Sequence, residues 1–278
     1  MRGDDWALAR FDRKEKHSDF SLFGMGLASP AKNGQIGVMW RRLFSRAGGS
    51  PRSKASPGKK IDLPQVTLLI YNPEKDPDLS ARVINHVCSG IEFGAVMHLA
   101  GRKPTIAHPG EWRQVPPANV TQGQRFQALE LNNYFSTPFL LHIETDGFPV
   151  NFHLWDPAFL EYDYVGAPWQ KRGLETGSNR VGNGGCSLQS KKFRNFVDAH
   201  AHLYREGTLS DVFFCQELYP QALSAGIRFA PLDLALHFSM ENKIPEFPGW
   251  KPSQSFAFHG RFPCFRDYLR PFGIEANR

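Results

Sequence analysis

The chain has 278 residues, 41% of them hydrophobic and 13% aromatic, which is ample for a buried core and excludes a protein that is disordered throughout. The net charge of +6 belongs to the start of the chain, because residues 1–60 hold 13 Lys and Arg against 5 Asp and Glu, whereas the rest hold 20 against 22. The folded part is therefore not expected to bind nucleic acid through a basic surface.

The sequence lacks the features of an exported or membrane-spanning protein. No apolar run approaches the ~20 residues that a membrane-spanning helix requires. The charged first 20 residues contain no apolar stretch typical of a signal peptide. The four cysteines lie far apart, without a CxxC pair, which indicates a reducing compartment. We expect a cytoplasmic protein.

Residues 1–60 are predicted to form a basic, poorly ordered tail. Residues 47–60 read AGGSPRSKASPGKK, a composition typical of a linker. Just upstream, residues 35–46 combine apolar side chains with three arginines. This segment is either a short solvated or partly packed helix, or a contact with the inner face of an anionic membrane or with a partner. Nucleic-acid binding would have to come from this tail, and its affinity would depend strongly on salt.

Ordered structure is expected over residues 61–278, as one α/β domain. Residues 66–71 form a continuous apolar, β-branched run typical of a strand buried on both faces, and a Pro-rich turn follows. The next elements are a helix from about Leu79 to Gly90, a strand at 95–99, a helix at about 124–135 and a strand at 139–143. This alternation predicts a mainly parallel sheet flanked by helices.

The second half of the domain is predicted to continue the same pattern. After Gly182 we expect a strand, helices at about 191–204 and 210–224, and short strands near Ile227 and Leu234. The chain contains no internal repeat.

Two carboxylates follow the strand at 139–143. Glu144 and Asp146 lie one residue apart, and Gly147 permits a tight turn after them. Ligands of open α/β sheets bind at the carboxyl ends of strands, and hard oxygen ligands suit Mg²⁺ or Mn²⁺. The alternative is an acidic turn that merely ends a strand.

Several motifs together resemble a known family. The segments ETDGFPVN, WDPAFLEYDYVGAPW, VGNGGCSLQS, GIRFAP and AFHG resemble the bacterial DUF5672 family over roughly residues 61–270. That family is similar to the GT-A glycosyltransferases. The resemblance implies a GT-A-like, Rossmann-like fold and the transfer of sugar from a nucleotide donor.

The resemblance implies a metal site and a sugar-binding loop. Glu144 and Asp146 match the acidic metal-binding motif, and His259 resembles the C-terminal histidine that completes the site with Mn²⁺ or Mg²⁺. A histidine flanked by aromatic residues is otherwise often a core residue. The loop beside the donor sugar and the acceptor is matched by Gly182, Asn183, Gly184 and Gly185. Small residues let a ligand approach the backbone, although such a string is also an ordinary turn.

The resemblance also implies a general base. Residues 209–217 resemble the acidic element that supplies the base in inverting members, with Asp211 as the first candidate and Glu217 as the second. The competing explanation is that Ser210 caps a helix and Asp211 interacts only with its dipole.

A charged loop between Pro168 and Gly182 is either a lid over the donor or a plain loop. As a lid, it would bring Lys171, Arg172 or Arg180 to the departing diphosphate. The roles of Asp156, Glu161 and Asp163 stay open between acceptor contacts and a solvated face, and Asp233 and His237 have no partner that the sequence reveals.

The resulting hypothesis is an inverting, metal-dependent transfer of a hexose from a nucleotide-diphosphate sugar, specifically a UDP-sugar, to a glycan or glycolipid hydroxyl in cell-surface polysaccharide biosynthesis. The alternative is a catalytically silent sugar- or nucleotide-binding module that its tail recruits to a membrane or an assembly.

Overall fold

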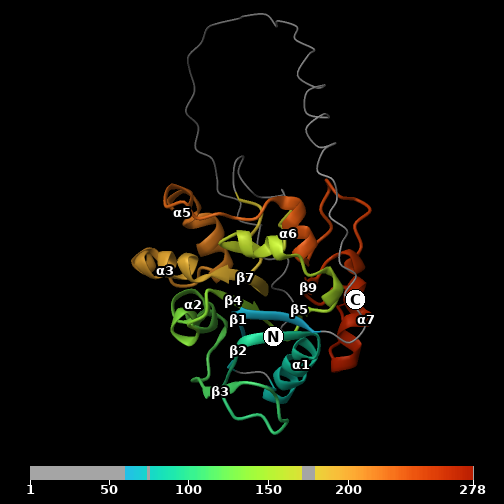
Figure 1. Cartoon of the computed structure of the whole chain (residues 1–278). Coiled ribbons are helices and arrows are strands. Elements are labelled where there is room, and N and C mark those ends of the chain that lie inside the picture. The colour runs from blue at the N-terminus through green and yellow to red at the C-terminus, as the bar shows by residue number, and fades with distance from the viewer. Residues whose placement is uncertain (1–59, 74–75, 171–178, 278) are drawn as a thin grey trace, which may run out of the picture. The chain divides into compact units, whose positions relative to one another are not determined.

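A computed structural model describes residues 60–73, 76–170 and 179–277 of the chain (Figure 1). The predictions for the tail, and for Lys171 and Arg172, lie outside the described residues. Each strand and helix below keeps the label that it has in Figure 1.

The centre of the domain is a six-stranded sheet in the order β3-β2-β1-β4-β7-β6. The three pairs β1–β2, β1–β4 and β2–β3 are parallel, whereas β4–β7 and β6–β7 are antiparallel. The predicted α/β class, with a mixed and mainly parallel sheet between helices, is confirmed. Its strands are β1 (Ile61–Asn72), β2 (Ile91–Ala100), β3 (Glu111–Gln114), β4 (Phe139–Ile143), β6 (Tyr164–Gly166) and β7 (Cys186–Ser190).

Strand β1 shows why its sequence is a continuous apolar run. Successive side chains point to opposite faces of a strand, so both faces of β1 must be covered. Leu68 and Ile70 belong to one buried cluster, whereas Leu69 and Tyr71 belong to another. None of the four is more than 6% exposed.

Helices cover the two faces of the sheet (Figure 1). Helix α1 (Pro77–Gly90) packs with α6 (Leu232–Phe238) and α7 (Arg266–Leu269) in the cluster that contains Leu68. Helix α2 (Val120–Leu129) covers the opposite face, where Phe126 stacks on Tyr71 with ring centroids 4.3 Å apart. A third cluster joins β6 to α3 (Lys191–Ala199), the π-helical segment η7 (Phe213–Glu217) and α5 (Tyr219–Ser224).

Local sequence signals set the starts of the first two helices. Asp76 caps α1 by accepting a hydrogen bond from the Asp78 amide, and Pro77 occupies the first turn, where a missing amide proton costs nothing. Helix α2 begins with a capping box between Asn119 and Gln122. It therefore starts four residues before the predicted position, and its predicted end is instead a 3₁₀ turn, η3 (Leu131–Tyr134).

A second, three-stranded sheet was not predicted. Its order is β5-β9-β8, and its strands are β5 (Gly147–Pro149), β8 (Ser239–Met240) and β9 (Ala257–His259). Strands of two or three residues are too short to show an alternating pattern. The other short elements are η4 (Phe152–Leu154), η5 (Pro157–Glu161), η6 (Ala201–Leu203), α4 (Ser210–Val212), η8 (Pro252–Gln254), η9 (Pro263–Phe265) and η10 (Arg270–Phe272).

The strand predicted near Leu234 is wrong, because residues 232–238 form α6. The sequence LDLAL alternates as a strand does, but Pro231 precedes a helix whose buried positions are Ala235, Leu236 and Phe238. Near Ile227 the only pairing in the described residues is an isolated bridge between Tyr164 and Phe229.

The helix predicted at 210–224 is interrupted. It consists of α4, the π-helical segment η7 and α5. Pro220 has no amide proton with which to continue the preceding helix, and it lies in the first turn of α5. The helix predicted at 191–204 is α3 followed by the 3₁₀ turn η6.

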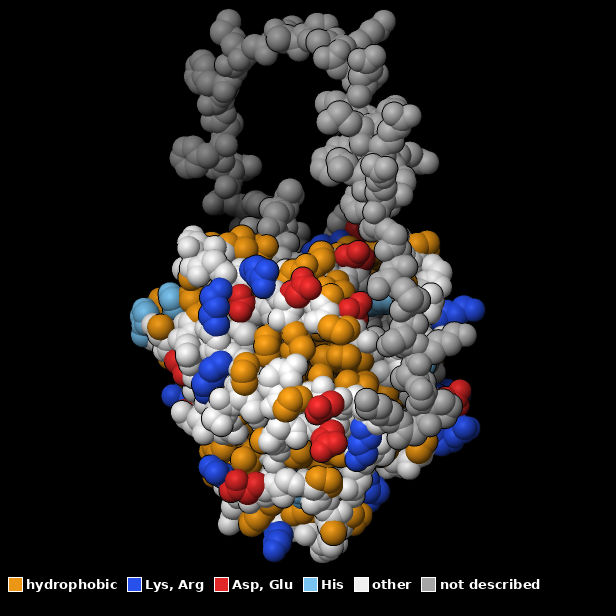
Figure 2. All heavy atoms as spheres, in the orientation of Figure 1, with side chains coloured by type: hydrophobic (Ala, Val, Ile, Leu, Met, Phe, Trp, Pro, Cys, Tyr) orange, Lys and Arg blue, Asp and Glu red, His pale blue; other side chains and the backbone are white. Residues whose placement is uncertain are grey.

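The described residues contain no disulfide and no helix that could span a membrane, and the face in Figure 2 has no basic patch. On the face that Figure 2 shows, Lys and Arg side chains are dispersed among acidic ones, with no single basic patch over the described residues. All four cysteines are free, and three are buried. Within the described ranges, no helix combines the length and the apolarity needed to cross a bilayer.

Candidate metal and donor site

The two predicted metal ligands project from one tight turn after β4. The backbone amide of Glu144 donates to the carbonyl of Gly147 (2.9 Å), and the amide of Gly147 donates back to Glu144 (3.2 Å). The four-residue turn is therefore closed at both ends. It places the carboxylates of Glu144 and Asp146 at the carboxyl end of a buried strand, where open α/β sheets bind ligands.

The register of the second sheet brings His259 to this turn. Gly147 of β5 pairs with His259 of β9. One ligand atom from each of Glu144, Asp146 and His259 lies within 4.8 Å of the others. Atoms that bind one ion at ~2.1 Å can be at most about 4.2 Å apart, so a small contraction of side chains would suffice. The structure thus brings the three predicted ligands together.

The donor set fits a divalent metal ion. Asp146 uses Oδ2 to accept a hydrogen bond from Arg261 Nε (3.0 Å), while its buried Oδ1 has no hydrogen-bond partner among the described residues. A buried carboxylate oxygen without a partner is costly unless an ion or a ligand satisfies it. Two carboxylates and an imidazole suit Mn²⁺ or Mg²⁺ as first ligands, because these ions accept oxygen donors and keep open positions.

His259 lies between two carboxylates. Its Nε2 is 3.7 Å from Glu144 Oε2, and its Nδ1 is 3.4 Å from Glu241 Oε1. Burial disfavours the charged imidazolium, yet the two carboxylates outweigh burial and raise the pKa of His259 to about 10. A metal ion would displace the proton on Nε2, and Glu241 would hold the ring through Nδ1, as carboxylates do behind many metal-binding histidines.

The predicted glycine-rich loop passes directly beside these ligands. It precedes β7, whose Cys186 pairs with Ile143, so Gly185 lies next to Glu144. A Cβ atom on Gly185 would be only 2.0 Å from His259 Nε2, and one on Gly184 would be 3.3 Å from Asp211 Cβ. Glycine is required at residue 185 for this close approach, and the loop lies between the candidate metal ligands and Asp211.

Buried polar side chains hold the loop from behind. The Tyr164 hydroxyl faces the carbonyls of Gly182 (3.0 Å) and Asn183 (3.2 Å), and His142 Nδ1 donates to Gly184 (3.0 Å). Burial lowers the pKa of His142, so it is neutral with its proton on Nδ1. Asn183 is itself buried and accepts a hydrogen bond from the Gly185 amide (3.1 Å). These contacts fix the backbone of the loop.

The two candidate bases occupy different surroundings. Asp211 is buried, lies against Gly184 and accepts a hydrogen bond from the Val212 amide (2.9 Å). Glu217 forms an ion pair with the exposed Arg205 at the other end of η7. Only Asp211 is next to the glycine-rich loop, and the π-helical segment that separates the two carboxylates is a feature common at functional sites.

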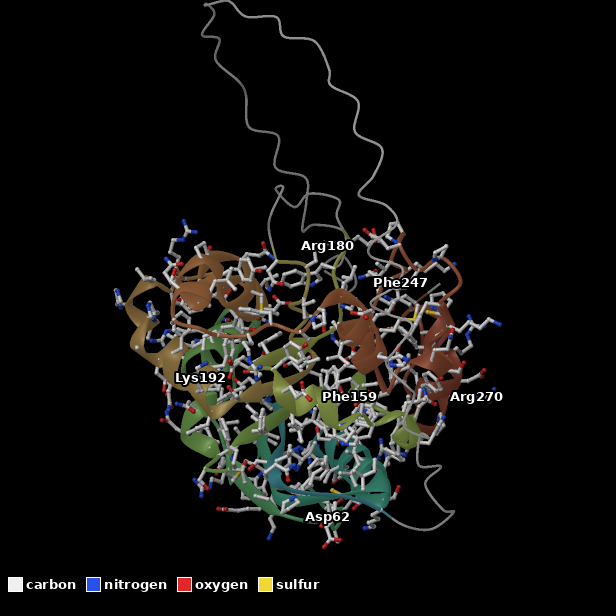
Figure 3. All side chains as sticks on the ribbon, turned by 45° about the horizontal axis from the view of Figure 1, so that its top comes forward. Asp62, Phe159, Arg180, Lys192, Phe247 and Arg270 are labelled. Atoms are coloured by element: carbon white, nitrogen blue, oxygen red, sulfur yellow. The ribbon has the colours of Figure 1, made fainter. Side chains whose placement is uncertain are left out.

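Arg180 has an ionic partner of its own. Its guanidinium forms two hydrogen bonds with Glu246 (2.8 and 3.2 Å) and two with the Trp169 carbonyl. Figure 3 shows Arg180 near Phe247, far from Asp62 at the start of β1. Its predicted role toward a departing diphosphate stays a prediction.

Two of the carboxylates whose roles the sequence left open, Asp156 and Asp163, have hydrogen-bond partners within the protein. Asp163 accepts hydrogen bonds from Ser190 Oγ (2.7 Å) and from the Arg228 amide (2.9 Å), and Asp156 caps η5. Neither needs a ligand to be satisfied.

A cavity of about 240 Å³ opens next to Glu144, one of the candidate metal ligands. Its walls come from the carboxyl end of β1, the first turns of α2 and the turn after β4. The residues that line it are Tyr71, Asn72, Pro73, Ala118, Asn119, Val120, Gly123, Gln124, Gln127, Glu144 and Thr145. Glu144 thus belongs both to the cavity wall and to the metal-ligand cluster. A second hollow, between α3 and α5, contains no acidic residue in its lining.

Sequence reasoning missed three residues of the site: Gln127, Glu241 and Arg261. The parallel pairing of β8 with β9 places Met240 beside Phe258, and hence Glu241 beside His259. An acidic residue directly after a short apolar segment was the only signal for Glu241, and it is weak. Gln127 and Arg261 had no signal, because their partners are 17 and 115 residues away along the chain.

The fold and the site together define an α/β protein in which two carboxylates and a histidine, a group that could hold a metal ion, lie together at the carboxyl edge of the sheet. Residues 125–259 match the model of the DUF5672 family, described as a protein of unknown function. The match confirms the resemblance that the motifs indicated, over a shorter range than the predicted 61–270. No curated protein matches the sequence significantly.

Solved glycosyltransferases are similar to this chain at low identity. The galactosyltransferase LgtC, solved with donor and acceptor sugar analogues, is 12% identical, with 75% of this chain and 94% of that chain covered and a TM-score of 0.46. An active-site mutant of LgtC is 13% identical over the same shares, with a TM-score of 0.44. A glycosyltransferase involved in glycosylating the major capsid protein of PBCV-1 is 12% identical, with 70% and 93% covered and a TM-score of 0.40. Values this low transfer no property to this chain.

Proposed function

We propose that this chain is a metal-dependent glycosyltransferase that transfers a hexose from a nucleotide-diphosphate sugar, specifically a UDP-sugar, to a hydroxyl of a glycan or glycolipid. One observation carries the proposal: Glu144 is shared between the cluster with Asp146 and His259 and the cavity at the carboxyl end of β1. A donor in which a diphosphate joins a nucleoside to a sugar matches this juxtaposition of a cavity and a candidate metal site.

The cavity suits the nucleoside part of the donor. At about 240 Å³ it is below the range of pockets that enclose a whole drug-sized ligand, roughly 300–1,000 Å³. Its lining includes the side-chain amides of Asn119 and Gln124. Their oxygens already accept hydrogen bonds from the Gln122 and Ser210 amides, so their NH₂ groups would face the hydrogen-bonding edge of a base. The diphosphate would then extend past Glu144.

The glycine-rich loop and Asp211 would bind the acceptor and take part in the transfer of the sugar. An acceptor hydroxyl beside Gly184 would be near the carboxylate of Asp211. The hydroxyl oxygen attacks the anomeric carbon, the bond from that carbon to the diphosphate oxygen breaks, and the nucleoside diphosphate leaves with the electron pair. Asp211 takes the hydroxyl proton, so a single displacement inverts the anomeric centre.

Glu144, Asp146 and His259 would hold Mn²⁺ or Mg²⁺. When bound, the ion would neutralise the negative charge that develops on the departing diphosphate. Arg261 keeps Asp146 Oδ2 occupied, so Asp146 would bind the ion through Oδ1.

The test is a panel of nucleotide sugars in Mn²⁺, measured by thermal shift on the parent chain, Asp146→Asn and Asp267→Asn. Asp267 is an exposed carboxylate in α7 and serves as the matched control. We expect a UDP-sugar to stabilise the parent and the control, and Asp146→Asn to lose the shift while its melting temperature without ligand changes little. Undiminished binding by Asp146→Asn would remove the metal assignment.

Binding and transfer are then separated by following the fate of the donor. Hydrolysis of the bound donor or its transfer to an added acceptor supports the enzyme. Metal-dependent binding without either reaction, across a broad set of acceptors, would identify a catalytically silent binding module instead.

A further inference from the structure

One buried amide joins the two halves of the site. Gln127 lies in α2 and is only 9% exposed. Its Nε2 donates to Glu144 Oε1 (3.3 Å), and its Oε1 accepts from Ser210 Oγ (3.1 Å). Ser210 immediately precedes Asp211. The side chain of Gln127 therefore spans from a metal-ligand carboxylate to the turn that carries the candidate base.

The chemistry of the partners fixes the orientation of this amide. The Glu144 carboxylate can only accept hydrogen bonds, so it must face the NH₂ group of Gln127. The carbonyl oxygen then points to Ser210. A flipped amide would place two acceptors against each other at Glu144, which a buried site does not tolerate.

Gln124, one helical turn before Gln127, provides an internal comparison. Its Oε1 accepts from the Ser210 amide (2.8 Å) and shares the single proton of Ser210 Oγ (2.9 Å) with Gln127 Oε1, whereas Glu144 is not among its hydrogen-bond partners. Both glutamines line the donor cavity and hold Ser210, but only Gln127 also holds Glu144.

We infer that Gln127 is a positioning residue, which orients the Glu144 carboxylate toward the metal and holds it at a fixed distance from Asp211. The inference rests on the proposed metal role of Glu144. A carboxylate ligand with one oxygen held by a hydrogen bond presents its other oxygen to the ion, and loss of such a partner typically costs 10–100-fold in metal affinity. In the structure the other oxygen, Oε2, is the one that faces His259.

The first experiment measures the affinity of the full-length chain for Mn²⁺ alone. Gln127→Met keeps the length of the side chain but removes both hydrogen bonds, and Gln124→Met is the matched control. We expect a 10–100-fold loss of Mn²⁺ affinity for Gln127→Met and a change of less than about 2-fold for Gln124→Met. If Gln127→Met does not fold, Gln127→Asn replaces it, because its shorter side chain cannot reach both partners. Equal affinity in the parent and Gln127→Met, or an equal loss in both variants, would overturn the inference.

The second experiment needs no metal. Melting temperatures are measured in chelator for Gln127→Met, Glu144→Ala and the double variant. If the two side chains interact, the double variant loses less than the sum of the single losses, and strict additivity would overturn the inference. A parent chain that binds no Mn²⁺ would refute the proposed function, while this cycle would still decide whether Gln127 holds Glu144.

Discussion

At the level of single residues, Asp211 and Glu217 compete for the role of base. Asp211 is buried against Gly184, whereas Glu217 is paired with the exposed Arg205. A base must lie within hydrogen-bond reach of the acceptor hydroxyl, and the loop that contains Gly184 is where we expect the acceptor. The surroundings therefore favour Asp211, which stays a prediction.

We predict that Asp211→Asn lowers turnover by about 10²-fold or more, because general-base catalysis contributes 10²–10⁴ and an amide cannot take the proton. Donor affinity should be nearly unchanged. The free energy of unfolding should fall by at most ~1 kcal/mol, since Asn can still accept the hydrogen bond from the Val212 amide. Turnover and melting temperature are measured on the same sample.

Glu217→Gln is the matched control for this prediction. It removes one surface ion pair and should change neither turnover nor stability appreciably. A normal rate for Asp211→Asn with a slightly lower melting temperature would move the base to Glu217, or indicate a retaining mechanism that needs no such residue.

At the level of elements, the two sheets meet at the turn after β4. Strand β7 brings Gly185 to Glu144, and strand β9 brings His259 to Gly147. The glycine-rich loop therefore lies against side chains that come from the ends of different sheets. A loop with any larger residue at 185 could not pass there without moving His259.

We predict that Gly185→Ala weakens Mn²⁺-dependent donor binding at least as strongly as loss of one metal ligand. The new Cβ would be 2.0 Å from His259 Nε2, so the imidazole or the loop must move. Overpacking of this kind typically costs 1–3 kcal/mol of stability. Gly249→Ala is the control, because a Cβ there has open space around it. Parent-like Mn²⁺ dependence in Gly185→Ala would contradict this prediction.

At the level of the whole molecule, a buried histidine makes stability depend on pH. His98 of β2 is fully buried, and its Nδ1 lies 3.1 Å from His108 Nε2. His108 Nδ1 faces the Pro109 carbonyl (2.7 Å) and must donate to it, so His108 Nε2 accepts and His98 Nδ1 donates. Burial, assisted by repulsion from His108 when charged, lowers the pKa of His98 to about 4.

We predict that His98 makes the chain less stable as the pH falls from about 6.5 to about 4. In this range the unfolded chain binds a proton that the folded chain excludes, so its contribution is complete above pH 6.5 and lost near pH 4. The lowering of the His98 pKa corresponds to roughly 3 kcal/mol of unfolding free energy. Urea unfolding at pH 7 and pH 4.5 checks this prediction. Between the two pH values the unfolding free energy of the parent should fall by more than that of His98→Leu. The exposed His153→Gln serves as control. An equal fall in both chains would contradict the buried neutral state.

We also predict that a chain beginning a few residues before Ile61 folds and retains donor binding. Strand β1 begins at Ile61, and the preceding Gly, Ser, Pro and Lys residues offer little apolar surface to bury. Solubility, the melting temperature and donor affinity are compared with those of the full chain. An insoluble or molten product would contradict the domain boundary.

The fold was predictable where the sequence contains long runs with a clear period. Strands β1, β2 and β4 and helix α1 were predicted, because an apolar run or a helical spacing reports burial within one element. Strands β3, β5, β6, β8 and β9 were missed, and α6 was taken for a strand. Elements this short are decided by their neighbours in space rather than by their own pattern.

For the site, the sequence by itself determined the chemical identity of the groups: paired carboxylates after a buried strand, a glycine-rich loop, a candidate base and a late histidine. Only the tertiary structure decided which of them meet. The register of β9 against β5 and β8 brings His259 to Asp146 and Glu241, and the approach of α2 to α4 places Gln127 between Glu144 and Ser210. At the same turn, the contact between Arg261 and Asp146 joins residues that are 115 positions apart. Local sequence patterns report burial within an element, whereas pairing between elements depends on the packing of the whole domain.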